Sequence, residues 1–165
     1  MHILESNDIN NCGVCWPIKT FNHDSIAWEK KVPLVMEASN RETSAVLKEV
    51  FSLLPFDIHE MPYENRKIMH MAASMSNNFI HHLLHIVHQI LDKYQLPPEL
   101  LVPLLNETIQ NINWDKLSET QTGPAVRGDQ KTIQNHLNVL RDNHVWKDLY
   151  ESITHSIMQT HSEKP

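Results

Sequence analysis

Polar but uncharged side chains follow one stretch of the sequence that is otherwise apolar. The segment from Ile68 to Leu91 contains no Asp, Glu, Lys or Arg, although it is long enough for about six helical turns. At about 100° per residue, its polar side chains fall close to one line along a helix, with Asn78 at the border: His70, Ser74, Asn77, His81, His85 and His88. Neutral donors and acceptors on a buried helix need partners, so the part from His70 to Asn78 could line a ligand cleft. The alternative is a hydrated face that uses histidine in place of lysine.

Four histidines at the C-terminal end of this segment could bind a transition metal. His81, His85 and His88 lie at i, i+4 and i+7, with His82 beside them, so two or three imidazoles could reach one ion. The same helix face offers no carboxylate, which metal sites usually include as a ligand or as a hydrogen-bond partner. We therefore predict no metal site, and a histidine-rich metal protein stays open as a third hypothesis.

The two cysteines have the spacing of half a zinc site or of a redox dithiol. Cys12 and Cys15 form a C-x-x-C pair, and no second pair follows. The residues Gly13 to Pro17 read as an extended strand, whereas a thioredoxin-like dithiol needs the start of a helix. We favour a packed strand, and the role of the pair stays open.

A second group of candidate residues lies in the long connection Asn113 to Gly128. Its sequence Thr122-Gly123-Pro124-Ala125-Val126-Arg127-Gly128 combines permissive glycines, a rigid proline and one cation, and Asp129 then follows as a helix cap. Arg127 could clamp a carboxylate or phosphate with its planar guanidinium, or it could pair with an acid inside a helical bundle. Connections of this length are often functional.

The elements that must position these residues change type along the chain. Two apolar runs, Gly13 to Phe21 and Val32 to Ala38, predict strands. Ser39-Asn40-Arg41-Glu42 is a capping box that predicts a helix as far as Pro55, and Phe56 to Met61 predicts another short strand. This β-β-α-β order suits the edge of a Rossmann-like sheet but has too few strands for a whole doubly wound domain.

From Pro62 onward, helical periodicity dominates. We predict helices near residues 62–94, 97–113, 129–142 and 144–160. The fold class is therefore mainly α, a short β-β-α-β segment followed by a helical bundle. The predicted parts are residues 1–11 as a leader or remnant, 12–61 as the edge of an α/β domain, and 62–165 as a helical dimerisation and substrate domain.

Composition excludes several classes of protein. The formal net charge of −6 over 165 residues gives no basic surface for nucleic acid. No apolar run is long enough to span a bilayer, and the first residues lack a basic region followed by an apolar one. We therefore expect a cytoplasmic protein that binds neither nucleic acid nor membrane.

Several blocks of the sequence resemble the C-terminal region of bacterial Rossmann-like proteins with a C-terminal domain of unknown function. The match covers nearly everything from residue 12 onward. Such proteins look like relatives of the pyrroline-5-carboxylate reductase, prephenate dehydrogenase and 6-phosphogluconate dehydrogenase group. That group has an N-terminal nucleotide-binding domain and a helical C-terminal domain that usually dimerises. The blocks are Gly13-Val14-Cys15-Trp16-Pro17-Ile18-Lys19-Thr20-Phe21, Glu37-Ala38, His70-Met71-Ala72-Ala73, Asn78-Phe79 and Gln121 to Asp129.

This resemblance implies roles for particular residues. Trp16-Pro17 stands where prephenate dehydrogenases have a His-Pro at the mouth of the cleft, and the helix from Pro62 would wall the substrate site. Enzymes of the 6-phosphogluconate type use a Lys and an Asn four residues apart on this helix. Ser74 and Asn78 are the nearest counterparts here, so the lysine is missing. The predicted catalytic residues are His70, Ser74 and Asn78, and the predicted substrate-binding residues are Trp16, Pro17, Thr122, Gly123, Pro124 and Arg127.

A nucleotide-binding motif is absent from the sequence. The chain has only three glycines, Gly13, Gly123 and Gly128, so no G-x-G-x-x-G can occur. The resemblance implies NAD(P) for the full-length family, but we expect this chain alone to bind none. Either it is an excised domain or a partial gene product.

Two functions are therefore predicted. The first is the C-terminal substrate and dimerisation domain of an NAD(P)-dependent oxidoreductase with a small acidic substrate, inactive without its nucleotide-binding half. The alternative is a stand-alone, non-enzymatic homodimeric module that binds a ligand or serves as a scaffold.

Overall fold

A short mixed sheet is followed by a series of helices. The computed structural model describes residues 9–20 and 31–162. The chain divides into two units, residues 1–83 and residues 84–165, and each is described by itself. The domain limits at residues 11 and 61 stay predictions.

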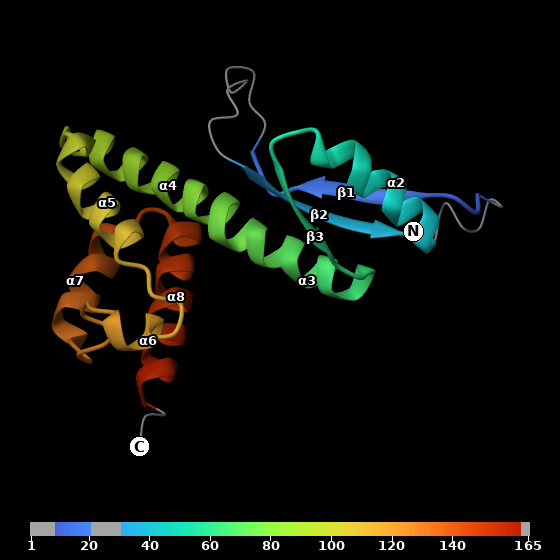
Figure 1. The fold of residues 1–165 in the computed structure, drawn as a ribbon. Coiled ribbons are helices and arrows are strands. Elements are labelled where there is room, and N and C mark those ends of the chain that lie inside the picture. The colour runs from blue at the N-terminus through green and yellow to red at the C-terminus, as the bar shows by residue number, and fades with distance from the viewer. Residues whose placement is uncertain (1–8, 21–30, 163–165) are drawn as a thin grey trace. The chain divides into compact units, whose positions relative to one another are not determined.

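The described part of the first unit contains a three-stranded sheet with β2 in the centre (Figure 1). β1 (Gly13–Pro17) pairs antiparallel with β2 (Val32–Ala38), and β2 pairs parallel with β3 (Phe56–Glu60). β2 carries the core, because Leu34, Val35 and Met36 are at most 1% exposed. The predicted β-β-α-β order is confirmed. The first strand ends at Pro17, earlier than predicted, and Phe21 lies outside the described residues.

Helices lie on both faces of this sheet (Figure 1). A Cβ atom added to Gly13 would lie 2.5 Å from Leu47 Cδ1, so this position of β1 faces α2 (Arg41–Ser52). Trp16 faces the other way, because successive strand residues alternate between faces, and its ring contacts His70. The sheet therefore separates α2 from the helix that carries His70.

The cap of α2 differs from the predicted one by one residue. The N-cap is Asn40, whose Oδ1 accepts a hydrogen bond from the Thr43 N–H at 2.8 Å. Ser39 was expected in this role, but its Oγ accepts from the Cys12 N–H at 3.1 Å instead. The capping-box prediction is wrong because Ser39 ties the end of β2 to the residue before β1.

The long helix predicted near residues 62–94 exists but is not uniform. Its middle is a six-residue π-helix, in which each turn contains about one extra residue. One extra residue changes the direction of all later side chains by about 100°. The single polar stripe from His70 to His88 is therefore interrupted, and this part of the prediction is wrong. The three parts are α3 (Tyr63–Ala73), η1 (Ser74–Phe79) and α4 (Ile80–Lys93).

The second unit is helical. Its core contains Ile86, Ile133, Leu137 and Leu140. The elements agree with the predicted helices, except that the second helix begins with a 3₁₀ turn and a short helix interrupts the long connection. They are η2 (Pro98–Leu101), α5 (Val102–Gln110), α6 (Leu117–Thr120), α7 (Gln130–Val139) and α8 (His144–Ser162). The predicted fold class, mainly helical with a small β-β-α-β sheet, is confirmed.

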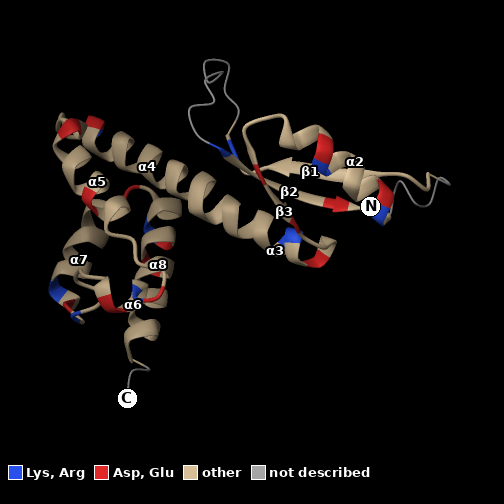
Figure 2. Ribbon diagram, in the orientation of Figure 1, with Lys and Arg blue, Asp and Glu red and all other residues tan. Residues whose placement is uncertain are grey.

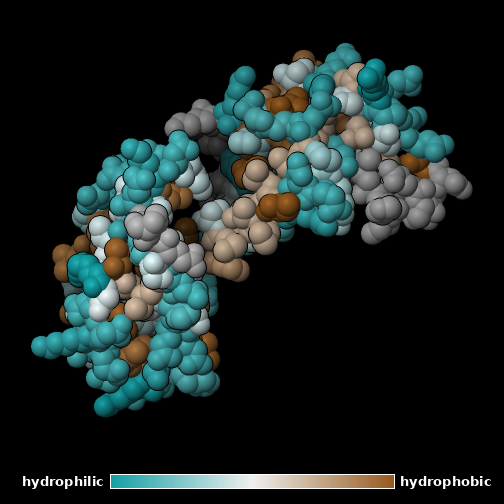
Figure 3. All heavy atoms as spheres, turned by 90° about the horizontal axis from the view of Figure 1, so that it is seen from below, coloured by the Kyte–Doolittle hydropathy of each residue, from teal (hydrophilic) through white to brown (hydrophobic). Residues whose placement is uncertain are grey.

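The surface of the helices is unusually apolar. Figure 2 shows no Lys, Arg, Asp or Glu on the helix between Lys67 and Asp92, and Figure 3 shows hydrophobic residues at the surface among hydrophilic ones. Ile68 and Phe79 on this helix are about 60% exposed. No helix in the described ranges combines the length and hydropathy needed to cross a membrane.

Candidate functional site

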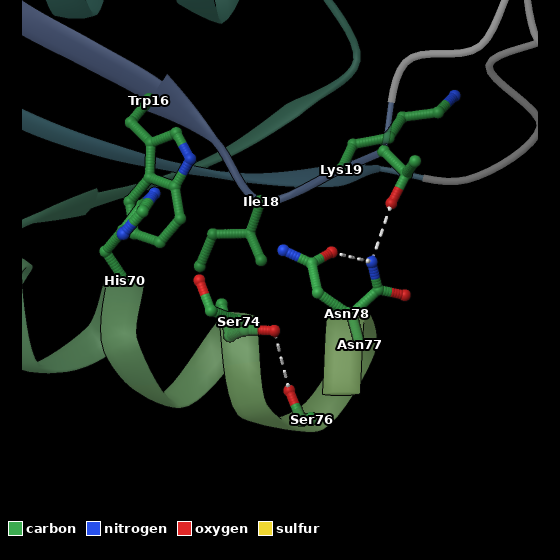
Figure 4. A pocket seen from close by; sticks show the side chains of 10 residues that line it. Trp16, Ile18, Lys19, His70, Ser74, Ser76, Asn77 and Asn78 are labelled. Atoms are coloured by element: carbon green, nitrogen blue, oxygen red, sulfur yellow. Dashed lines mark hydrogen bonds between the residues drawn. The ribbon is translucent and has the colours of Figure 1, made fainter. Parts of the chain in front are cut away.

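A cleft of about 450 Å³ lies in the first unit, between the end of β1 and the helix formed by α3 and η1 (Figure 4). Four of the predicted site residues line it, namely Trp16, His70, Ser74 and Asn78. The sheet side of the cleft is formed by Trp16, Ile18, Lys19 and Thr20, and the helix side by His70, Ala73, Ser74, Ser76, Asn77 and Asn78. The structure thus brings together residues that the sequence places more than fifty positions apart.

One end of the cleft is an aromatic wall. The rings of Trp16 and His70 lie with their centroids 5.2 Å apart and their planes tilted by 53°. Trp16 is half-buried and His70 is exposed. This arrangement leaves an imidazole beside an apolar surface, so a ligand could contact a flat ring and a proton-exchanging group together.

The other end of the cleft is an amide pair. Asn77 donates from Nδ2 to Thr20 Oγ1 at 3.2 Å and to Asn78 Oδ1 at 3.1 Å. Both amides belong to the π-helix η1, whose wider turns are frequent at functional sites. The helical stripe included Asn77, but neither Asn77 nor Thr20 was selected as a site residue. The signal that could have found Asn77 was its place in the part of the stripe that was expected to line a cleft.

An ion pair holds the helix against the sheet. Arg66 Nη2 lies 2.8 Å from Glu37 Oε2, and the two side chains are 11% and 18% exposed. The Tyr63 N–H, at the start of α3, donates to Glu37 Oε1 at 3.1 Å, which suits a carboxylate at a helix N-terminus. Glu37 is the last residue but one of β2. Its contacts with Arg66 and Tyr63 therefore fix where α3 begins. They also bring His70, one helical turn beyond Arg66, to Trp16.

The groups at the cleft floor are neutral amides and hydroxyls. The cleft also contains Lys19, which follows β1, but its ammonium points away from Ser74 and Asn78 in Figure 4. Recognition at this floor would therefore rely on directed hydrogen bonds more than on net charge.

The remaining predicted site residues do not line this cleft. Pro17 belongs to β1, and Thr122, Gly123, Pro124 and Arg127 belong to the second unit. Gly123 and Gly128 have positive φ angles of 116° and 64°, which explains glycine at both positions. Thr122 lines a separate groove of about 820 Å³ near α5 and α8.

Asp129 caps α7 as predicted. Hydrogen bonds from the Thr132 hydroxyl and backbone N–H, together with the nearby Arg127 charge, hold the pKa of Asp129 below its usual range. Arg127 itself is exposed. Its use as an anion clamp stays a prediction.

The cysteines and the described histidines form no assembled metal site. Cys12 and Cys15 are both free thiols, and burial raises the pKa of Cys15, which disfavours the reactive thiolate. Within residues 9–20 and 31–162, no group of three or more His, Cys, Asp or Glu side chains is arranged to hold a metal ion. The histidine-rich metal hypothesis gains no support from this arrangement.

The turn between β2 and α2 does not fit a dinucleotide. A pyrophosphate binds at a helix N-terminus through free backbone N–H groups and needs glycines for close approach. Here the Asn40 side chain already accepts from the Thr43 N–H, and the turn contains no glycine. This strand-helix connection therefore offers no place for the pyrophosphate of NAD(P).

Comparisons with known proteins identify relatives. Residues 32–157 match the model of a family described as a domain of unknown function, DUF2520. The crystal structure of BF3122 from Bacteroides fragilis, a "putative NADP oxidoreductase", superimposes with a TM-score of 0.88 at 34% sequence identity, covering 96% of this chain and 61% of that one. A comparison with curated proteins gave no match.

A more distant structure has the same fold. Protein TM1727 from Thermotoga maritima superimposes with a TM-score of 0.66 at 20% identity, covering 91% of this chain. At that identity the likeness concerns the fold alone. This chain spans 61% of the length of both solved proteins.

Proposed function

This chain belongs to the DUF2520 family, and from that premise we propose that it forms the substrate-binding and dimerising part of an NAD(P)-dependent oxidoreductase. The observation that carries the proposal is the cleft in which Trp16, His70, Ser74 and Asn78 meet. The likeness to the Bacteroides protein supports the reaction class. As part of the same proposal, this chain is related to the group of pyrroline-5-carboxylate reductase, prephenate dehydrogenase and 6-phosphogluconate dehydrogenase.

The cleft residues would bind and orient a small acidic substrate. Asn78 and Ser74 would hydrogen-bond its oxygen atoms, and Trp16 would cover one side of it. His70 would give or accept a proton at the reacting oxygen, since an imidazole changes charge near neutral pH. The catalytic lysine of the 6-phosphogluconate-type enzymes is missing, because Ser74 is its nearest counterpart here.

The hydride would come from a nicotinamide cofactor held elsewhere. Hydride transfer is the chemistry of the cofactor, and the protein contributes binding and orientation. The strand-helix turn of this chain does not fit the pyrophosphate, so we propose that the chain by itself does not catalyse the reaction. Binding of NADPH to this chain at micromolar affinity would contradict this division of roles.

The exposed apolar side chains favour a homodimer formed through the helices. Ile68 and Phe79 in the first unit, and Leu104 and Ile109 in the second, are all more than half exposed. Exposed apolar surface of this extent marks interaction sites. The same observation favours the second candidate function, a non-enzymatic homodimeric module.

Ligand-dependent stabilisation separates the two functions. The melting temperature should rise on adding small mono- and dicarboxylates at millimolar concentration, because a ligand that binds only the folded state stabilises it. His70→Ala and Asn78→Ala should abolish the rise, whereas His88→Ala and Asn106→Ala, which replace exposed residues outside the cleft, should leave it intact. A melting temperature that no acid changes would favour the non-enzymatic module.

A further inference from the structure

The two adjacent amides at the cleft, Asn77 and Asn78, have unequal roles. A carboxamide has an acceptor end and a donor end of nearly the same shape, and a rotation of 180° exchanges them. A ligand that meets a freely rotating amide can therefore be either a donor or an acceptor. What selects between them is the partner that fixes the amide from the other side.

Asn77 is such a partner, because both hydrogens of its Nδ2 are engaged. One points to Thr20 Oγ1 at 3.2 Å and the other to Asn78 Oδ1 at 3.1 Å. With its oxygen held by Asn77, Asn78 must present its nitrogen on the opposite side. Figure 4 shows that nitrogen directed away from Asn77, into the space beside Ile18 and Ser74.

The amide pair lies within the π-helix. Asn77 and Asn78 are neighbours in η1, and both line the same cleft. Thr20 then holds the outer amide from the segment after β1, so the pair is fixed from the sheet side.

We propose that Asn77 is a positioning residue that, anchored by Thr20, fixes Asn78 with its Nδ2 toward the ligand. The cleft then selects ligands that present a carbonyl or carboxylate oxygen and rejects ligands of the same size that present only N–H groups. This inference rests on the proposed function and specifies the group by which the substrate is held.

The first experiment tests the positioning without any ligand. The {¹H}-¹⁵N nuclear Overhauser effect of the Asn78 side-chain amide reports whether that amide is fixed. It should be high in the full chain and in Thr20→Ser, which keeps the hydroxyl. It should fall in Asn77→Ala and in Thr20→Val, which has nearly the same shape without the acceptor. An unchanged value in Asn77→Ala would overturn the positioning role.

The second experiment tests the selection with two probes of the same size and planar shape. Acetate should shift the Asn78 side-chain amide signals, and acetamidinium, which presents only N–H groups, should leave them in place. In Asn77→Ala the apparent Kd for acetate should rise about tenfold, as expected for a weakened hydrogen bond to a charged group. Asn106→Ala on α5 should leave the Kd unchanged, and backbone amide spectra verify that every variant is folded.

The two experiments fail in different ways. If the Asn78 amide is fixed by Asn77 but acetate shifts no cleft signal, acid binding in the cleft is wrong and the proposed function fails with it. If acetate binds the cleft equally well in Asn77→Ala, the proposed function survives and the selection by Asn77 is wrong. Shifts of Asn78 by acetamidinium equal to those by acetate would also overturn the selection.

Discussion

β2 in the first unit and α5 in the second are both apolar segments, but they differ in how much of their side-chain surface is buried. Leu34, Val35 and Met36 of β2 are covered completely by their own unit, whereas α5 has no buried residue and Ile109 is 65% exposed. Burial of apolar surface contributes about 25 cal/mol per Å². The sheet of the first unit obtains this stabilisation from its own chain, whereas α5 obtains little of it within the described residues.

Truncation in the sheet core should show the largest effect. We expect Leu34→Ala to lower the free energy of unfolding by about 2–5 kcal/mol, because it removes buried contacts and leaves a cavity. Urea denaturation followed by tryptophan fluorescence measures the change. Leu53→Ala, at a side chain that is 83% exposed, is the control and should change stability by less than about 0.5 kcal/mol. Equal losses in both variants would contradict the contrast between covered and exposed apolar residues.

Substitution on α5 should act on assembly and leave the core intact. The chain should have the mass of a dimer in size-exclusion chromatography with light scattering. Ile109→Ser should raise the dimer dissociation constant, at a cost of about 1–2 kcal/mol. Val46→Ser, at a similarly exposed apolar residue of α2, should leave the mass unchanged. A monomeric parent chain would show that α5 is not part of a self-interface.

The smallest effect should come from an exposed carboxylate at the end of β3. Hydrogen bonds from Lys48 and Ser44 hold the pKa of Glu60 below its usual value of about 4.5. Because the folded-state pKa is the lower one, Glu60 contributes stability above about pH 4.5, and this contribution is lost as the pH falls through the folded value. The pH dependence of unfolding between pH 3 and 6 should therefore become slightly flatter in Glu60→Gln, and the exposed Glu49→Gln is the control. An identical pH profile in Glu60→Gln and the parent would show that these hydrogen bonds do not last in solution.

Local signals predicted much of the fold. The apolar run Val32–Ala38 became β2 with the predicted bounds, because a continuous apolar run between polar residues has few other solutions. Asp129 was predicted as a helix cap and is one. Both signals depend only on neighbours in the sequence.

Features that depend on distant residues could not be predicted in this way. Asn40, and not Ser39, is the N-cap of α2, because the Ser39 hydroxyl accepts a hydrogen bond from the Cys12 N–H. The ion pair of Glu37 with Arg66, which sets the start of α3, joins residues with no sequence periodicity between them. The amide pair at the cleft lies in a π-helix, which the apolar periodicity of the segment does not reveal.

The candidate site was therefore predicted in part. Trp16, His70, Ser74 and Asn78 were selected from the stripe and from the family resemblance, and the structure gathers them in one cleft. Asn77 and Thr20 also line that cleft, but only the structure identified them as site residues. The roles of all these residues, and those of Thr122 and Arg127 in the second unit, stay predictions.

The π-helix from Ser74 to Phe79 also has a consequence for how relatives should be aligned. A π-turn is what remains when one residue is inserted into an α-helix and the flanking turns keep their places. A relative with a regular helix in this segment should need a one-residue gap opposite residues 74–79. The presence or absence of that gap would divide the family into chains with the π-helix and chains with a regular helix, before any of their structures is known.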